Sequence, residues 1–207
     1  LFKGEHVRGT FFTRTPSSEA LATSNAGLAR SPNKATGGRA RLPSVSTLLL
    51  FFAIYLAAAA FGRWMTIVPG DPVTVWPPNG VIIAALLMHR RETWPWWIAL
   101  GVFGEIIGNF LWYNSTVIAA FGYIVANAAA IFAAGYILAP LFDAPIRRLT
   151  KLSQVLGLLV IGVLIAPMIS ATIGSAFVAL EGKSSFAATW PLWWLGDATG
   201  TLIATPI

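Results

Sequence analysis

The sequence predicts an all-α protein, a bundle of helices embedded in a membrane, and three observations support this fold class. The mean hydropathy of the chain is +0.70, and 56% of its 207 residues are hydrophobic. Only 11% are charged, whereas ordinary soluble domains have about 25%. Apolar runs of helical length recur along the chain, separated by short polar or proline-containing segments. We therefore expect a polytopic integral membrane protein whose main partner is the lipid bilayer.

Charge divides the chain into two parts. Residues 1–43 carry seven Lys or Arg against two acidic residues, and residues 44–207 carry seven against six. The first part is rich in Ser, Thr, Ala, Gly and Arg and has no hydrophobic period, so we expect residues 1–43 to be a disordered basic cytoplasmic tail. Residues 44–207 form the expected membrane domain. Because the excess charge belongs to the tail, it does not indicate nucleic-acid binding.

Six apolar segments are the expected membrane spans. In chain order they are Val45 to Trp64, Pro77 to Met88, Trp94 to Phe110, Thr116 to Leu138, Val155 to Leu180 and Pro191 to Ile207. The first has about the 20 residues that a bilayer core requires. The second reaches only about 20 Å as a helix at 1.5 Å per residue, and a re-entrant segment is its alternative. Pro167 is expected to kink the fifth. The sixth is cut short, so we interpret the chain as a fragment that is open at its carboxyl end.

The basic clusters favour a spanning second segment. If it spans, the basic tail, His89-Arg90-Arg91 and the cluster from Arg147 to Lys151 all lie on one side. That side is cytoplasmic by the positive-inside rule. If the second segment is re-entrant, the last two clusters face outward. The spanning interpretation gives six crossings, with both ends of the chain in the cytoplasm.

Two aromatic segments, each marked by Pro or Gly, open the second and sixth spans and form a candidate site. Trp76 and Asn79 belong to the first segment, and Trp193, Trp194 and Asp197 belong to the second. Polar side chains at membrane depth are costly and usually have a partner or a function. For Asp197 we favour a structural role over direct ligand contact. It would lie in the first turn of its helix, stabilised by the helix dipole or by a salt bridge to Arg63.

The third span carries a polar face. Glu105, Asn109 and Trp112 are spaced i, i+4 and i+7, so they share one side of a helix. Glu105 is either a structural residue that forms a hydrogen bond with another span, for which Asn127 is the candidate partner, or part of a ligand or proton site. Both interpretations remain open, and Asn109 and Asn127 join the candidate site residues.

Other patterns indicate packing and no chemistry. Small residues recur at helix-packing spacing, which allows the close backbone approach that membrane helices need. The sets are Gly104 and Gly108; Ala126, Ala130 and Ala134; Ala166, Ser170 and Gly174; and Gly196, Gly200 and Ala204. The chain has no Cys, and its two His residues have no partners at ligand spacing, so we expect no metal and no cofactor. No catalytic motif is present, and we expect that the chain is not an enzyme.

Several blocks resemble one known family. They are Trp76-Pro77-Pro78-Asn79-Gly80-Val81, Ala84-Ala85-Leu86-Leu87, Trp94-Pro95, and Trp194-Leu195-Gly196-Asp197-Ala198-Thr199-Gly200 with Pro206. In order and rough spacing they resemble the first-described family of bacterial membrane-associated sensor domains, from about residue 46 to the end. This sequence departs from the family pattern at Asn79, where a small residue such as Ala is common.

The resemblance implies an input module of about eight helices in the bacterial inner membrane. Such modules precede a cytoplasmic histidine kinase, diguanylate cyclase, phosphodiesterase or PAS-type domain, so an effector domain in cis is the expected partner. The signal would be an undefined small molecule or membrane protein, and a second copy of the chain is a further candidate partner. The alternatives are a small transporter or channel, with Glu105, Asn109 and Asn127 as its polar path, and a purely structural anchor.

Overall fold

The computed structural model describes residues 42–65, 75–113 and 115–205, and within these ranges the chain is helical and contains no strand. The elements are α2 (Val45–Trp64), α3 (Pro78–Met88), η1 (Arg91–Thr93), α4 (Trp94–Leu111), α5 (Val117–Leu141), α6 (Leu152–Gly157), η2 (Leu158–Ile165), α7 (Ala166–Leu180) and α8 (Phe186–Ala204). Residues 1–41 of the expected tail, and most of the loop expected between the first two spans, lie outside the described residues.

Hydroxyl side chains fix the beginnings of three helices. Ser44, Thr116 and Ser185 precede α2, α5 and α8, and each accepts a hydrogen bond from the backbone N–H three residues later. Such caps satisfy N–H groups that the first helical turn leaves unpaired. The Ser185 cap starts α8 at Phe186, so Pro191, the expected first residue of the sixth span, lies inside the helix.

Three of the described helices, not six, are long and apolar enough to cross a membrane: Val45–Trp64, Val117–Leu141 and Leu152–Leu180. The prediction of six such spans is therefore wrong on length and composition. Helix α3 has 11 residues, and α4 and α8 combine apolar residues with Trp, Pro, Gly and an acidic residue each. Helix α3 is apolar but short, whereas α4 and α8 are less apolar; all three pack against the longer helices, where helix contacts replace part of the lipid contact.

The third long helix is continuous from Leu152 to Leu180 but is not α-helical throughout. Its middle part, η2, is a π-helix that ends two residues before Pro167. Proline cannot donate a backbone hydrogen bond, and its ring crowds the carbonyl of the preceding turn. Longer-range π-helical bonding is one way for a helix to accommodate such a break. The disturbance expected at Pro167 thus appears as π-helical turns on its amino-terminal side.

Successive helices run alternately between two ends of the bundle. At one end, called here the basic end, the ring of His89 after α3 lies 4.2 Å from Trp97 near the beginning of α4. The Ile146 N–H after α5 donates to the Leu87 carbonyl at 2.9 Å. The basic residues between positions 89 and 151 therefore lie together, as the charge pattern predicted. The beginning of α2 is at this end too, because Phe51 packs on Trp97 with ring centroids 5.2 Å apart.

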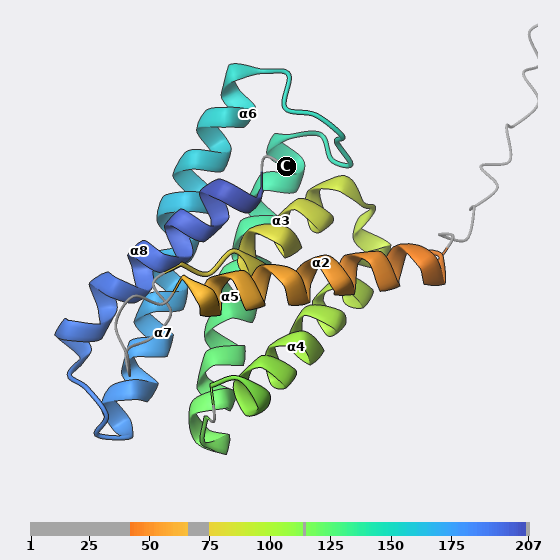
Figure 1. The fold of residues 1–207 in the computed structure, drawn as a ribbon. Helices are drawn as coiled ribbons and strands as arrows, with labels where there is room; N and C mark the ends of the chain where they lie inside the picture. The colour runs from red at the N-terminus through yellow and green to blue at the C-terminus, as the bar shows by residue number, and fades with distance from the viewer. Residues whose placement is uncertain (1–41, 66–74, 114, 206–207) are drawn as a thin grey trace, which may run out of the picture. The chain divides into compact units, whose positions relative to one another are not determined.

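Tyr113 marks the opposite end, called here the Tyr113 end. The guanidinium of Arg63, in the last turn of α2, lies 5.6 Å from the centroid of the Tyr113 ring. The Trp76 ring before α3 packs against the same tyrosine at 6.2 Å. Near it, the Thr116 hydroxyl donates to Glu181 in the loop after α7. Figure 1 shows α5 in the middle of this bundle, with α7 and α8 on one side, α4 on the other, and α2 running across the front in this view.

The core lies between the helices, and the outer faces are apolar. Tyr55, Leu86, Trp97 and Leu138 are at most 1% exposed. Large apolar side chains such as Leu49 and many others along the helices are exposed. An outer surface of this kind is unfavourable in water and favourable in lipid. The fold is thus that of a membrane-embedded helix bundle.

Candidate functional site

The two aromatic segments that open α3 and α8 in the sequence meet in the structure through their backbones. The N–H of Trp76 donates to the Gly196 carbonyl at 3.0 Å. One turn further along α8, a Cβ atom on Gly200 would lie 2.2 Å from the Trp76 carbonyl carbon. A Cβ on Gly80 would lie 2.9 Å from the Thr201 Cα. Glycine is therefore required where the non-helical residues before α3 cross α8.

A chain of buried hydrogen bonds, called here the polar network, runs across the bundle beside this crossing. Asn127 of α5 is its centre. Its side-chain oxygen accepts from Asn79 Nδ2 at 2.9 Å and from Ser170 Oγ at 3.0 Å. Its Nδ2 donates to Glu105 Oε1 at 2.6 Å. The expected hydrogen bond between Glu105 and Asn127 is confirmed.

The polar network continues into α8. The indole N–H of Trp193 donates to Ser170 Oγ at 3.0 Å. A Cβ on Gly174, one turn after Ser170, would lie 2.4 Å from the Trp193 ring, so glycine allows the indole to reach α7. The Tyr123 ring of α5 packs against the same indole edge-on at 5.1 Å. Five helices, α3, α4, α5, α7 and α8, thus each contribute one side chain to the polar network.

Asp197 lies next to the polar network, and its carboxyl group interacts with two of the network residues. It is 2% exposed, its carboxyl group lies beside Ser170 and Trp193, and its Oδ2 has no hydrogen-bond partner in the described part of the chain. The expectation of a first-turn acid is wrong, because α8 begins eleven residues earlier, at Phe186. The salt bridge to Arg63 is absent from the described residues as well, since Arg63 lies over Tyr113.

The remaining candidate residues lie outside the polar network. Asn109 is buried, but its amide donates to the Glu105 backbone carbonyl at 3.0 Å and accepts from the Ser115 hydroxyl at 3.0 Å, so its bonds are local. Trp194 donates to the Leu164 carbonyl of η2 and stacks on Trp190. The three tryptophans of the candidate site contact different parts of the bundle: Trp76 packs on Tyr113, Trp193 on α7, and Trp194 on η2.

Ser170 is the network residue that the sequence did not single out as polar. It appeared there as one of three small residues on a packing ridge with Ala166 and Gly174. A serine on such a ridge is compatible with packing alone, and only the positions of Asn127 and Trp193 reveal that its hydroxyl is bonded on both sides. Spacing within one helix could not show this.

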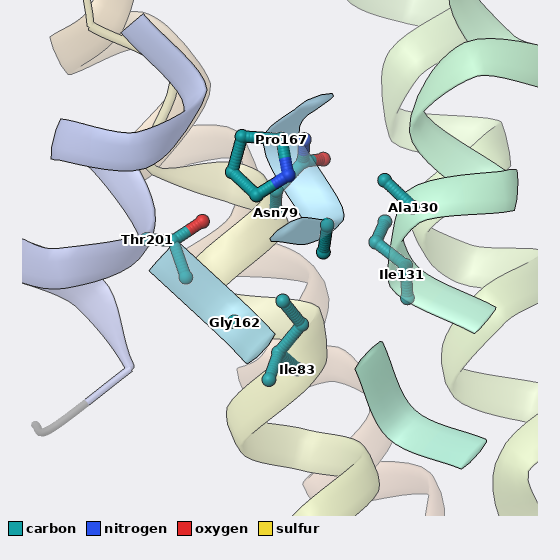
Figure 2. Close-up of a pocket in the computed structure, with 8 residues that line it drawn as sticks. Asn79, Ile83, Ala130, Ile131, Gly162, Pro167 and Thr201 are labelled. Atoms are coloured by element: carbon teal, nitrogen blue, oxygen red, sulfur yellow. The ribbon is translucent and has the colours of Figure 1, made fainter. Parts of the chain in front are cut away.

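A small cavity of about 10 Å³ adjoins the polar network at Asn79. Figure 2 shows Ala130 and Ile131 on one side of it, Thr201 on the other and Ile83 near its base. It is large enough for about one water molecule. The walls come from α3, α5, η2, α7 and α8, the junction that the polar network crosses. Among the described residues, no group of three or more His, Cys, Asp or Glu side chains could hold a metal ion.

Polar contacts at the Tyr113 end are exposed, in contrast to the polar network. Glu181 accepts a hydrogen bond from the Thr116 hydroxyl and forms an ion pair with Lys183 at 3.0 Å. These contacts, the Thr116 hydrogen bond first, lower the pKa of the Glu181 carboxyl from its ordinary value. They join the loop before α5 to the loop after α7. Because both partners of Glu181, Thr116 and Lys183, are exposed, the contribution to stability is small.

Comparison with known proteins gives one match. The model of the MASE1 family matches residues 47–207, a range that contains every residue of the polar network. Neither the curated proteins nor the solved structures gave a match.

Proposed function

Because the chain belongs to the MASE1 family, a family of membrane-associated sensory domains, we propose that it is the sensory input domain of a bacterial signal-transduction protein. The domain lies in the inner membrane and relays its state to a cytoplasmic output domain in the same protein, a histidine kinase or an enzyme of cyclic-di-GMP turnover. The signal is a small molecule or a membrane protein that contacts the bundle.

The observation that carries this proposal is the polar network. One side chain from each of five helices takes part in it, and Asn127 is bonded to three of the other four. Hydrogen bonds are directional, so a displacement of one helix breaks a bond on its neighbours. A helix bundle that serves only as a membrane anchor can be held together by small residues and apolar contacts. A buried polar junction of this extent supports a switching element.

A signal can shift such a bundle only through different affinity for two of its states. The crossing of the Trp76 segment with α8 is the part best suited for this. The segment is not helical where it crosses α8, and the first turn of α3 that follows it carries Asn79 into the polar network. A ligand or partner that moves Trp76 would therefore act on Asn127 through Asn79, three residues further along the chain.

A transporter or channel is less well supported. Such a protein needs a polar path between the two ends of the bundle. In the part of the chain that the structure describes, the bonds of Asn109 are local and the cavity at Asn79 has room for about one water molecule. The polar groups lie at one level of the bundle and do not line a passage.

The proposed orientation places the basic end in the cytoplasm. It rests on the common position of the two basic clusters after α3 and α5 and on the positive-inside rule. Single cysteines at positions 90 and 151 should be protected from an impermeant label in intact cells, and one at position 183 should react. Labelling of position 90 from outside would contradict the orientation.

The sensor function is tested with Glu105→Gln in the full-length protein. Gln keeps the oxygen that accepts from Asn127 but cannot ionise, so folding should be preserved while the signalling output per inserted molecule changes. Glu92→Gln is the control, because Glu92 is an exposed acid at the basic end that pairs with Arg90. If Glu105→Gln and Glu105→Leu both leave the output per inserted molecule unchanged under conditions that modulate the wild type, Glu105 is only structural.

A further inference from the structure

Two neighbouring arginines at the basic end have different surroundings. Arg90 forms an ion pair with Glu92, with Nε and Oε2 3.2 Å apart. Arg91 has no acidic partner among the residues that the structure describes. Its guanidinium instead lies 5.5 Å from the ring centroid of Trp94 and 5.5 Å from that of Tyr136. The second ring comes from α5, so Arg91 is held at the junction of two helices.

Trp94, one of the two rings beside Arg91, is held firmly in place. Trp94 is 6% exposed, and its indole N–H donates to the Leu86 carbonyl at 2.9 Å. A Cβ on Gly135 would lie 3.3 Å from the Trp94 ring, which shows that α5 packs tightly on the indole. Cation–π contact uses the flat face of a guanidinium and leaves its N–H edges free. Arg91 is thus preorganised to donate two parallel hydrogen bonds to an anion.

More positive charge lies beside Arg91. The hydrogen bond from Ile146 to Leu87 brings the loop after α5 to the loop that carries Arg91. Arg147, Arg148 and Lys151 follow in that loop, and all three are exposed. Neither Glu92 nor Asp143, the acidic residues of these two loops, forms an ion pair with them in the described structure. The basic end thus presents several free cations around one fixed guanidinium.

We infer that Arg91, with the basic loop from Arg147 to Lys151, forms a binding site for the phosphate group of an anionic phospholipid. Planar bidentate donation is the geometry that favours arginine over lysine at phosphates. Trp96, in the same helical turn as Trp94, is 45% exposed, as expected for an indole at the headgroup level of a membrane. Basic residues directly beside a membrane helix attract anionic lipids. The apolar outer faces next to the site would accept the acyl chains.

The positive-inside rule alone does not require this site. It depends on the number of positive charges and not on a guanidinium fixed between two rings. The chain offers a matched comparison at the other end, where Arg63 lies over the single ring of Tyr113. The proposed site binds lipid only, so its test is independent of the proposed sensor function.

The test is thermal unfolding of the purified chain in detergent with added short-chain lipids. Phosphatidylglycerol should raise the unfolding temperature in a concentration-dependent way, because a ligand that binds the folded state stabilises it. Phosphatidylcholine and inorganic phosphate at equal concentrations should not. Arg91→Gln should lose most of the shift, Arg91→Lys should lose part of it, and Arg63→Gln should retain it. Size-exclusion profiles and unfolding temperatures without lipid establish that the variants are folded.

Three results would overturn the inference. The first is an equal shift from phosphatidylcholine, which would indicate a general effect of amphiphiles. The second is an equal shift from inorganic phosphate, which would make the ligand a soluble anion. The third is a phosphatidylglycerol shift in Arg91→Gln as large as that of the wild type, which would assign the effect to the total charge.

Discussion

The contact of α2 with α4 and the contact of α3 with α8 solve the same packing problem differently. Between α2 and α4, glycine leaves room for an aromatic side chain: a Cβ on Gly104 would lie 2.5 Å from the Tyr55 ring. In the same contact, Phe51 packs on Trp97. Between α3 and α8, glycines receive backbone, as Gly200 does at Trp76. The polar network takes side chains from both helices of the second contact, Asn79 and Trp193, but only Glu105 of α4 from the first. Among the described residues, helix α2 contributes no side chain to the hydrogen bonds of the network.

The two contacts therefore differ in what they do: the first only packs two helices together, whereas the second can couple the movement of one helix to that of the other. An aromatic ring can turn or slide when its neighbour changes, so the α2–α4 contact tolerates small shifts. A backbone crossing that also carries directional hydrogen bonds tolerates few positions. The α3–α8 crossing, together with the polar network, is therefore suited to switch between two discrete positions. Helix α2 only supports the bundle by packing against it.

The largest expected effect comes from adding one methyl group at each contact. Gly200→Ala places a Cβ against the Trp76 backbone, which cannot move aside without breaking the crossing, and we expect loss of most folded protein. Gly104→Ala meets the Tyr55 side chain and should cost about 1–3 kcal/mol, the usual range for overpacking. For both variants, the measurements are the amount of protein in the membrane and the monodispersity of its size-exclusion profile. Gly108→Ala is the control, because its nearest neighbour would be 3.6 Å away. If Gly200→Ala and Gly104→Ala reduce the amount of folded protein equally, the proposed difference between the two contacts is wrong.

A smaller effect is expected from two buried serines of α7. Ser170 bonds Asn127 and Trp193, whereas Ser175, equally buried, has no hydrogen-bond partner in the described structure. Ser170→Ala removes the hydroxyl that accepts from the Trp193 indole and donates to Asn127, and should destabilise the domain by about 1 kcal/mol. Ser175→Ala removes an unsatisfied hydroxyl and should be neutral or stabilising. Thermal unfolding in detergent compares them, and destabilisation by Ser175→Ala alone would contradict the assigned network.

The smallest effect belongs to the exposed contacts at the Tyr113 end. The lowered pKa of Glu181 means that its contacts stabilise the protein above the ordinary pKa of 4.5, and that this contribution is lost as the pH falls through the lowered value. Glu181→Gln should therefore be slightly less stable than the wild type at neutral pH, and the two should converge in acid. Unfolding temperatures from pH 7 down to about pH 3 test this. If the difference in unfolding temperature instead grows as the pH falls, the direction of the Glu181 contribution to stability is wrong.

The helices were largely predictable because apolar periods and proline or serine signals are local. Helix α2 runs from Val45 to Trp64 as predicted. The start of α8 was missed because Pro191 resembles a helix start, while Ser185 is the actual cap. The number of long apolar helices was overestimated because α3, α4 and α8 are recognisable as helices but not as independent spans.

The candidate site was predictable in its members but not in its connections. Asn79, Glu105, Asn127 and Trp193 stand out because polar and indole groups inside apolar segments are unusual. That they form one network depends on how α3, α4, α7 and α8 are placed around α5, and no spacing within a single helix contains this information. Asn109 shows the converse, since it shares a helix face with Glu105 yet bonds only to its own neighbourhood.

The most direct test of the polar network as the sensing element compares two buried asparagines in the full-length protein. Asn127→Leu removes the centre of the network, whereas Asn109→Leu removes bonds confined to residues 105–115. The measurement is signalling output per correctly inserted molecule, with and without the conditions that modulate the wild type. We expect Asn127→Leu to lose the modulation and Asn109→Leu to retain it. Retained modulation in Asn127→Leu, or equal loss in both variants, would contradict the account.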